Sequence, residues 1–217
     1  MFDDNEILIE EKILNNCKPY LNLLKHLAKN GMKRPLLRGS AQPYDDLTKI
    51  TVEERKKPMS MELKDHTIAD QWFKNQFNIE ARSKTVFTTT NRGLAKRYGT
   101  IHYIFPIGKF SVINSSEYTD LFFYMGTLTK SKVYKELYGV PENSELETND
   151  QIKEFMKYLY DNEPDKYQTM IYEILKQGNY EKNNYNESFK NGNEIMLKCK
   201  SFYIISAESE RINEFIN

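Results

Sequence analysis

Hydrophobic residues recur at helical spacing in three parts of the chain. Across residues 3–30 they return at intervals of three and four, and Asn30-Gly31 supplies a stop signal. Pro19 interrupts this stretch, so we predict two helices or one kinked helix there. The same spacing predicts a helix over 65–77 and a block of helices over about 128–177.

Shorter runs of apolar residues, most of them β-branched or aromatic, predict strands between these helices. The runs are PLLRG (35–39), TVFTTT (85–90), TIHYIFPIG (100–108) and KFSVIN (109–114), with a closing strand pair at about 194–198 and 202–206. NRGLAKRYG (91–99) is typical of a short helix, and the polar stretches 40–60 and 178–192 are expected to be loops. The pattern predicts an α+β domain with a compact, mostly antiparallel sheet.

Composition narrows the class of protein. The chain has 217 residues, of which 39% are hydrophobic, enough for a core and unlike a disordered chain. Lys+Arg and Asp+Glu balance at 31 each, so total charge gives no argument for a partner of either sign.

Two cysteines and three histidines are not at metal-ligand spacing, so we expect no metal site and no disulfide. The acidic start and the lack of a long apolar run predict a soluble, cytoplasmic protein with no membrane association.

Two features of the predicted strands could carry chemistry. Arg38 ends the first strand and is followed by Gly39; an arginine leaving a buried strand needs an anion, either a ligand or a structural Asp or Glu. Thr88, Thr89 and Thr90 precede the short helix, and Thr88 and Thr90 are expected to share one face of the strand. The alternative for the triplet is β-propensity combined with helix capping.

A third feature is Glu194, at the mouth of the closing strand pair. Taken alone, it is expected to be a solvated residue at a strand start.

The order LLRG, FTTT and NEIML, followed by SFYII, resembles the Arg–Ser–Glu class of ADP-ribosyltransferases, and in particular its small bacteriophage members. The resemblance covers about 35–39, 85–112 and 187–206. It implies a split antiparallel sheet, with 1–31 as an N-terminal helical segment and 32–217 as the catalytic domain, in which about 128–177 is a helical insertion. It also implies that the chain acts on host molecules in the cytoplasm of an infected cell.

The resemblance also assigns roles. Arg38 would hold a phosphate or ribose of NAD and brace the triplet, and Gly39 would meet the nicotinamide carboxamide. Thr88 would hydrogen-bond the catalytic glutamate, with Thr89 and Thr90 supporting the strand and the cofactor. Glu194 would bind the nicotinamide-ribose 2′-OH and stabilise the positive charge that develops as the glycosidic bond breaks. NAD is the substrate, and no metal is needed.

The chain departs from the family pattern in the loop before Glu194. Arginine-modifying members carry Glu two positions before the catalytic Glu, where this chain has Gly192. The acceptor-selecting residues would then be Tyr185, Glu187 and Phe189, although an ordinary mobile loop explains them equally well. Glu117 is the alternative carboxylate. His66, Trp72 and Arg82 could line the pocket.

These residues predict a mono-ADP-ribosyltransferase that modifies a macromolecule, with a host protein as the first candidate and RNA or DNA as open alternatives. An NAD glycohydrolase using the same residues is a second hypothesis. A catalytically inactive binding or accessory protein is the third.

Overall fold

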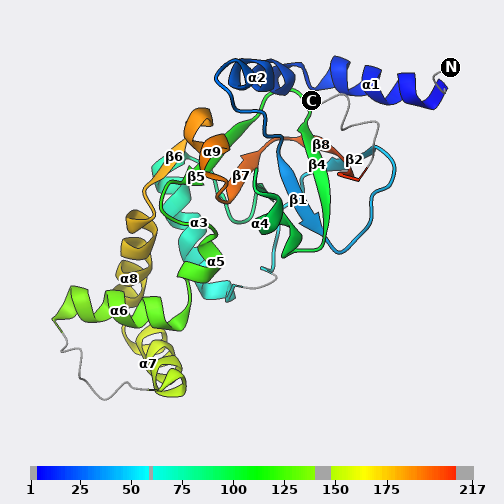
Figure 1. The fold of residues 1–217 in the computed structure, drawn as a ribbon. Helices are drawn as coiled ribbons and strands as arrows, with labels where there is room; N and C mark the ends of the chain where they lie inside the picture. The colour runs from blue at the N-terminus through cyan, green and yellow to red at the C-terminus, as the bar shows by residue number, and fades with distance from the viewer. Residues whose placement is uncertain (1–3, 59–60, 140–147, 209–217) are drawn as a thin grey trace. The chain divides into compact units, whose positions relative to one another are not determined.

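A computed structural model of the chain describes residues 4–58, 61–139 and 148–208. They form an α+β structure (Figure 1). The helices are α1 (Asp4–Asn16), α2 (Lys18–Lys29), α3 (Leu63–Phe77), α4 (Arg92–Lys96), α5 (Leu121–Tyr124), α6 (Thr127–Tyr138), α7 (Asn149–Asn162), α8 (Pro164–Gln177) and α9 (Tyr185–Asn191). The strands are β1 (Leu37–Ser40), β2 (Thr48–Thr51), β3 (Val86–Thr88), β4 (Thr100–Pro106), β5 (Ser111–Ser115), β6 (Tyr180–Lys182), β7 (Ile195–Lys198) and β8 (Ser201–Ser206).

The chain forms two compact units. The first, here called the sheet unit, comprises 1–54, 84–116 and 181–217, and the second, the helical unit, comprises 55–83 and 117–180. The expected N-terminal helical segment belongs to the sheet unit. The expected insertion at about 128–177 is part of the larger helical unit, whose first segment contains α3 and whose second segment begins at residue 117.

Two four-stranded sheets make up the centre of the sheet unit, in the orders β1-β4-β8-β2 and β3-β7-β5-β6. β4 pairs antiparallel with β1 and β8, and β7 pairs antiparallel with β3 and β5. β7 and β8 were expected to pair with each other, and that expectation is wrong: they belong to different sheets, as do β4 and β5. An antiparallel bridge between Leu37 and Thr89 joins β1 of one sheet to the residue after β3 of the other.

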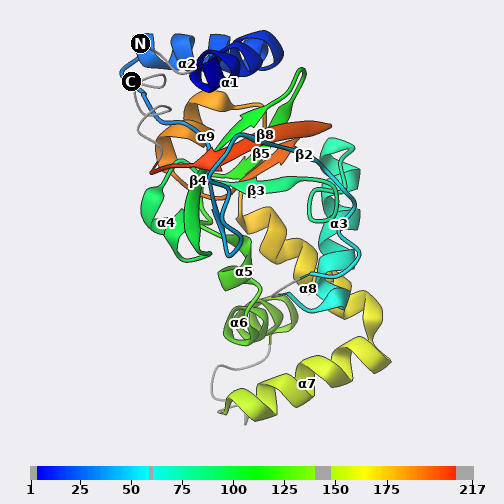
Figure 2. The same ribbon diagram turned by 90° about the vertical axis from the view of Figure 1, so that its right-hand side faces the viewer.

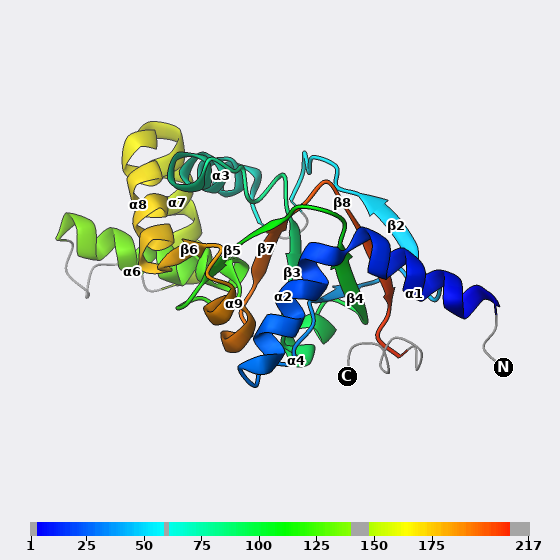
Figure 3. The ribbon, with the colours of Figure 1, turned by 90° about the horizontal axis from the view of Figure 1, so that it is seen from above.

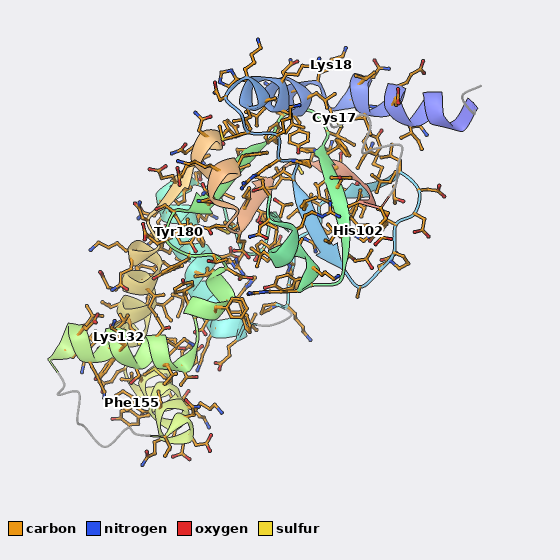
Figure 4. The ribbon with its side chains drawn as sticks, viewed as in Figure 1. Cys17, Lys18, His102, Lys132, Phe155 and Tyr180 are labelled. Carbon is orange, nitrogen blue, oxygen red and sulfur yellow. The ribbon has the colours of Figure 1, made fainter. Side chains whose placement is uncertain are left out.

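The N-terminal helices supply part of the core of the sheet unit. Figures 1 and 3 show α1 and α2 lying beside the strands, and Cys17, labelled in Figure 4, marks their junction. The break predicted from Pro19 is confirmed, because α2 starts at Lys18 with the proline in its first turn. Tyr20 is fully buried and its hydroxyl accepts a hydrogen bond from the Leu36 backbone amide at 2.7 Å. This bond ties α2 to the segment that leads into β1.

The helical unit consists of α3 and α5–α8 (Figure 2). A buried ion pair links α6 to α3, with Lys130 Nζ 2.5 Å from Asp65 Oδ2. The hydroxyl of Tyr167 on α8 donates to the other oxygen of Asp65 at 2.6 Å. Three helices are therefore connected through one carboxylate.

Two stretches expected to be loops contain regular structure. Within 40–60, Thr48–Thr51 forms β2, which is paired with β8. Within 178–192, Tyr180–Lys182 forms β6 and Tyr185–Asn191 forms α9. α9 is capped by Asn184, whose side chain accepts from the Glu187 backbone amide, and it ends at Gly192 in the left-handed conformation. In the part of the chain that the structure describes, no helix is both long enough and apolar enough to cross a membrane.

Candidate functional site

The three sequence motifs meet where the two sheets join. The Leu37 amide donates to the Thr89 carbonyl at 2.7 Å, and the Thr89 amide donates back to the Leu37 carbonyl at 2.9 Å. Thr88 is paired with Ile195 across the β3–β7 ladder. Arg38 directly follows Leu37 and Glu194 directly precedes Ile195, so the structure brings the Arg38 strand, the threonine triplet and the Glu194 segment together.

Arg38 is partly buried and has no carboxylate partner among the described residues. Its guanidinium donates from Nη1 to the Phe87 carbonyl at 3.1 Å, which holds the side chain against the strand that carries the triplet. Burial lowers the pKa of Arg38 from its ordinary value, although an arginine keeps its charge. The structural alternative, an ion pair with Asp or Glu, is not found within residues 4–58, 61–139 and 148–208.

Gly39 has a packing reason to be glycine. A Cβ on this residue would lie 2.0 Å from the Ala95 carbonyl oxygen and 2.8 Å from the Tyr98 Cβ. The end of α4 therefore crosses directly over β1 at this point. This contact explains the glycine without a ligand.

All three threonines of the triplet are buried, and their hydroxyls hold the chain from α9 to the start of β7. Thr88 Oγ1 donates to the Ile195 carbonyl at 3.1 Å, Thr89 Oγ1 to the Gly192 carbonyl at 2.7 Å, and Thr90 Oγ1 to the Phe189 carbonyl at 3.1 Å. The expected partner of Thr88 was the carboxylate of Glu194; the partner found is the backbone carbonyl of the next residue. The strand ends at Thr88, so strict alternation of faces does not apply to Thr89 and Thr90.

Asparagine side chains hold the same segment from the other side. Asn193 Nδ2 donates to the carbonyls of Ser115 at 2.9 Å and Ser116 at 3.3 Å. Asn191 Nδ2 also donates to the Ser115 carbonyl, at 3.2 Å. Sequence reasoning missed these residues; the signal available was the run of Asn between the predicted helical block and the closing strands, which it assigned to a polar loop.

Glu194 lies in the extended link between α9 and β7 and is partly exposed. The next residue, Ile195, pairs with Thr88 and with Asn114, and the preceding residue, Asn193, donates from its side chain to the Ser115 carbonyl. Its backbone is therefore held on both sides by hydrogen-bonded neighbours, while its side chain keeps access to solvent.

Gly192 is required by the backbone. Its φ is +73° and a Cβ there would come within 3.2 Å of the Asn91 Cβ. Asn91 in turn caps α4, since its side chain accepts from the Leu94 amide at 3.2 Å. A carboxylate side chain at position 192 would need a different end to α9.

The predicted acceptor residues lie on α9. Phe189 is fully buried in the core, so its side chain cannot contact an acceptor molecule. The prediction that Phe189 helps to select the acceptor is therefore wrong. Tyr185 is partly buried and packs edge-on against Phe110 at 5.9 Å. Glu187 is partly exposed in the first turn of α9 and keeps access to solvent.

Four further candidates belong to the helical unit and are described within it. Glu117 is exposed. His66 Nε2 lies 3.0 Å from Ser83 Oγ, and the amide of Arg82 donates to the Asp70 carboxylate. Trp72 packs on Phe73, Phe77 and Tyr180. These contacts give His66 and Trp72 structural roles in the helical unit.

His102 is the direct strand neighbour of Arg38 and is fully buried (Figure 4). Burial lowers the pKa of His102, which favours the neutral ring beside the guanidinium. Its ring meets Tyr44 edge-on at 5.3 Å. Across the described ranges, no three His, Cys, Asp or Glu side chains gather as a metal site would require.

Comparisons of the chain with models of protein families, with curated proteins and with solved structures return no match.

Proposed function

We propose that this chain is a mono-ADP-ribosyltransferase, which transfers ADP-ribose from NAD to a macromolecular acceptor and releases nicotinamide. The observation that supports the proposal best is Arg38. It is a partly buried cation with no carboxylate partner among the described residues, and it is fixed to the strand that leads into Thr88. Burying an arginine without a counter-charge lowers the stability of the fold. The same guanidinium can form charge-assisted hydrogen bonds to a phosphate group.

Glu194 supplies the second half of the chemistry. Cleavage of the bond between ribose and nicotinamide builds positive charge on the ribose, and a carboxylate held beside that carbon lowers the barrier. A carboxylate does this only if its position is fixed before the reaction. The hydroxyls of Thr88 and Thr89 and the amide of Asn193 supply that fixation through the backbone around Glu194.

The acceptor is not expected to be arginine. The carboxylate that would orient a guanidinium is replaced by Gly192, whose left-handed conformation ends α9. Glu187 is five residues before Gly192, in the first turn of α9, and is the one carboxylate of that helix. We propose a protein acceptor first, modified at a residue that Glu187 can orient.

The absence of a carboxylate at position 192 also favours a second candidate function, NAD glycohydrolase. Water as the acceptor needs no side chain to orient it. Arg38 would bind NAD and Glu194 would stabilise the developing positive charge, as in the transferase. The two activities differ only in where the ADP-ribose goes.

The test uses NAD labelled on the adenylate, incubated with the protein with and without a cell lysate. We expect label on lysate macromolecules; free ADP-ribose without labelled acceptor would indicate the hydrolase. Glu194→Gln should lower turnover by about 10²–10³-fold, the range for one lost transition-state stabiliser, while NAD binding persists. Glu10→Gln, an exposed position on α1, is the matched control and should leave turnover unchanged. No NAD consumption by the wild-type protein with any lysate, or full activity in Glu194→Gln, would contradict the proposal.

A further inference from the structure

The sheet unit contains a cavity that the candidate site does not use. Its volume is about 730 Å³, and it is lined by the end of β2 and the residues after it, Lys84, the start of β5 and the link between β7 and β8. Neither Arg38, nor the threonine triplet, nor Glu194 lines it. Lys198 stands at the opposite end of β7 from Glu194, roughly 13 Å away along a strand that rises about 3.3 Å per residue. We call this cavity the basic pocket.

The charge of the basic pocket differs from that of the whole chain. Lys84, Lys109, Lys198 and Lys200 line it, against two carboxylates, whereas the whole chain is neutral. Lys198 Nζ donates to the Lys84 carbonyl at 3.3 Å, which holds it at the wall. Lys109 and Lys200 are exposed and form no ion pair with any residue that the structure describes. The rim is therefore suited to an anion.

The inner wall is apolar. Phe110 is partly buried and is held by edge-on contacts to Tyr20 and Tyr185, each at 5.9 Å between ring centres. Cys199 is buried, and burial raises the pKa of its thiol to about 12, so it stays neutral and forms part of the wall. The backbone amide of Val52 donates to the Lys200 carbonyl at 3.0 Å, which fixes one wall to the rim. The volume falls within the roughly 300–1,000 Å³ of small-ligand sites.

The two carboxylates select among anions. Glu53 and Glu54 are exposed at the pocket, and Lys84 Nζ lies 3.7 Å from Glu54 Oε2. Carboxylates repel an acidic peptide, yet accept hydrogen bonds from hydroxyl and amino groups. A matching ligand carries a phosphate for the lysines, a flat ring for the apolar wall and hydrogen-bond donors for the two carboxylates.

We propose that the basic pocket binds a nucleoside phosphate, with the phosphate on Lys109 and Lys200 and the nucleoside against Phe110 and Val52. The phosphate comes either from a free mononucleotide or from the end of a single-stranded nucleic acid. The site is independent of the proposed transferase activity, because it shares no residue with it.

The experiment measures fluorescence anisotropy of a labelled single-stranded hexadeoxyadenylate, with unlabelled AMP as competitor. The test variant is Lys109→Gln/Lys200→Gln. The matched control is Lys132→Gln/Lys153→Gln, two exposed lysines on helices of the helical unit, of which Lys132 is labelled in Figure 4. Arg38→Gln tests whether the probe occupies the candidate NAD site instead.

We expect the test variant to weaken binding at least tenfold. For two lost phosphate contacts, the slope of log K against log salt concentration should become less steep by about 1.4, taking ~0.7 per contact for single strands. The control variant and Arg38→Gln should bind like the wild type. Displacement of the probe by AMP identifies a mononucleotide site, and binding of the hexamer alone identifies the end of a nucleic acid.

Three results would overturn the proposal. They are no binding of the labelled hexadeoxyadenylate, equal weakening in the test and control variants, and weakening in Arg38→Gln alone.

Discussion

Thr89→Val should loosen the segment that carries Glu194. The Thr89 hydroxyl donates to the Gly192 carbonyl at 2.7 Å and accepts from the Asn91 amide at 3.0 Å, and the side chain is 4% exposed. Valine has nearly the same shape, so the substitution removes the two hydrogen bonds and leaves no cavity.

The magnitude follows from the bonds lost. Each intramolecular hydrogen bond contributes about 1 kcal/mol net, and a buried group left without a partner costs about 1–3 kcal/mol. Because the Gly192 carbonyl and the Asn91 amide lose the same partner, we expect opening of residues 189–198 to become easier by about 2–3 kcal/mol. At 1.4 kcal/mol per factor of ten, this raises the equilibrium constant for opening, and with it the rate of hydrogen exchange, by roughly 30–140-fold.

Hydrogen exchange followed by mass spectrometry of peptides from 189–198 measures this opening directly. Thr169→Val is the matched control: its hydroxyl donates to the Asp165 carbonyl at 2.8 Å on the exposed side of α8, where a surface change costs within about 0.5 kcal/mol. If Thr89→Val accelerates exchange in 189–198 no more than Thr169→Val does in α8, the account of how Glu194 is positioned is incorrect.

Three further predictions concern buried ionisable groups. Asp65→Asn leaves Lys130 buried without its counter-charge and should lower the free energy of unfolding by about 3–5 kcal/mol, measured by urea denaturation, whereas Asp65→Asn/Lys130→Met should restore part of the loss. Burial raises the pKa of both Cys17 and Cys199 to about 12, so Ellman's reagent at pH 8 should react slowly with the native protein and rapidly in urea; rapid native labelling would contradict the described burial. Burial lowers the pKa of His102 below the value of about 6.5 in an unfolded chain, so the unfolded state binds the proton more readily and stability should fall as pH drops from 7 to 5. His102→Gln should flatten that dependence, and an unchanged slope would contradict it.

The sequence predicted the elements whose local pattern is strong. The helices of 3–30, 65–77 and 128–177 follow from apolar spacing and from Pro19, and β3 follows from its β-branched run. β2 was missed because its four residues, TKIT, become a strand only through pairing with β8, about 150 residues away in the sequence. α9 was missed because its Asn-rich sequence contains a single buried apolar residue, Phe189, on which the helix packs.

The residues of the candidate site could be proposed from the sequence, but their hydrogen-bond partners could not. That Arg38, the threonine triplet and Glu194 lie close together was implied by the resemblance of the ordered motifs to a known family. The partner of each hydroxyl was not, because Thr88 bonds a backbone carbonyl whose position depends on the end of α9. The same holds for Asn193, whose role depends on Ser115 in another strand. The partners of Thr88 and Asn193 are 107 and 78 residues away in the sequence, so no local pattern indicates them.

The placement of β7 and β8 has a consequence for how the protein can be made. β8 lies between β4 and β2, and β7 lies between β3 and β5, so residues 195–206 supply an inner strand to each sheet. During synthesis, β2 and β3 leave the ribosome more than 100 residues before the strands that pair with them. Until then they are exposed strand edges, of the kind that drives aggregation of incomplete chains. Neither sheet can close before almost the whole described chain has been synthesised, so folding of the sheet unit is a late and cooperative event.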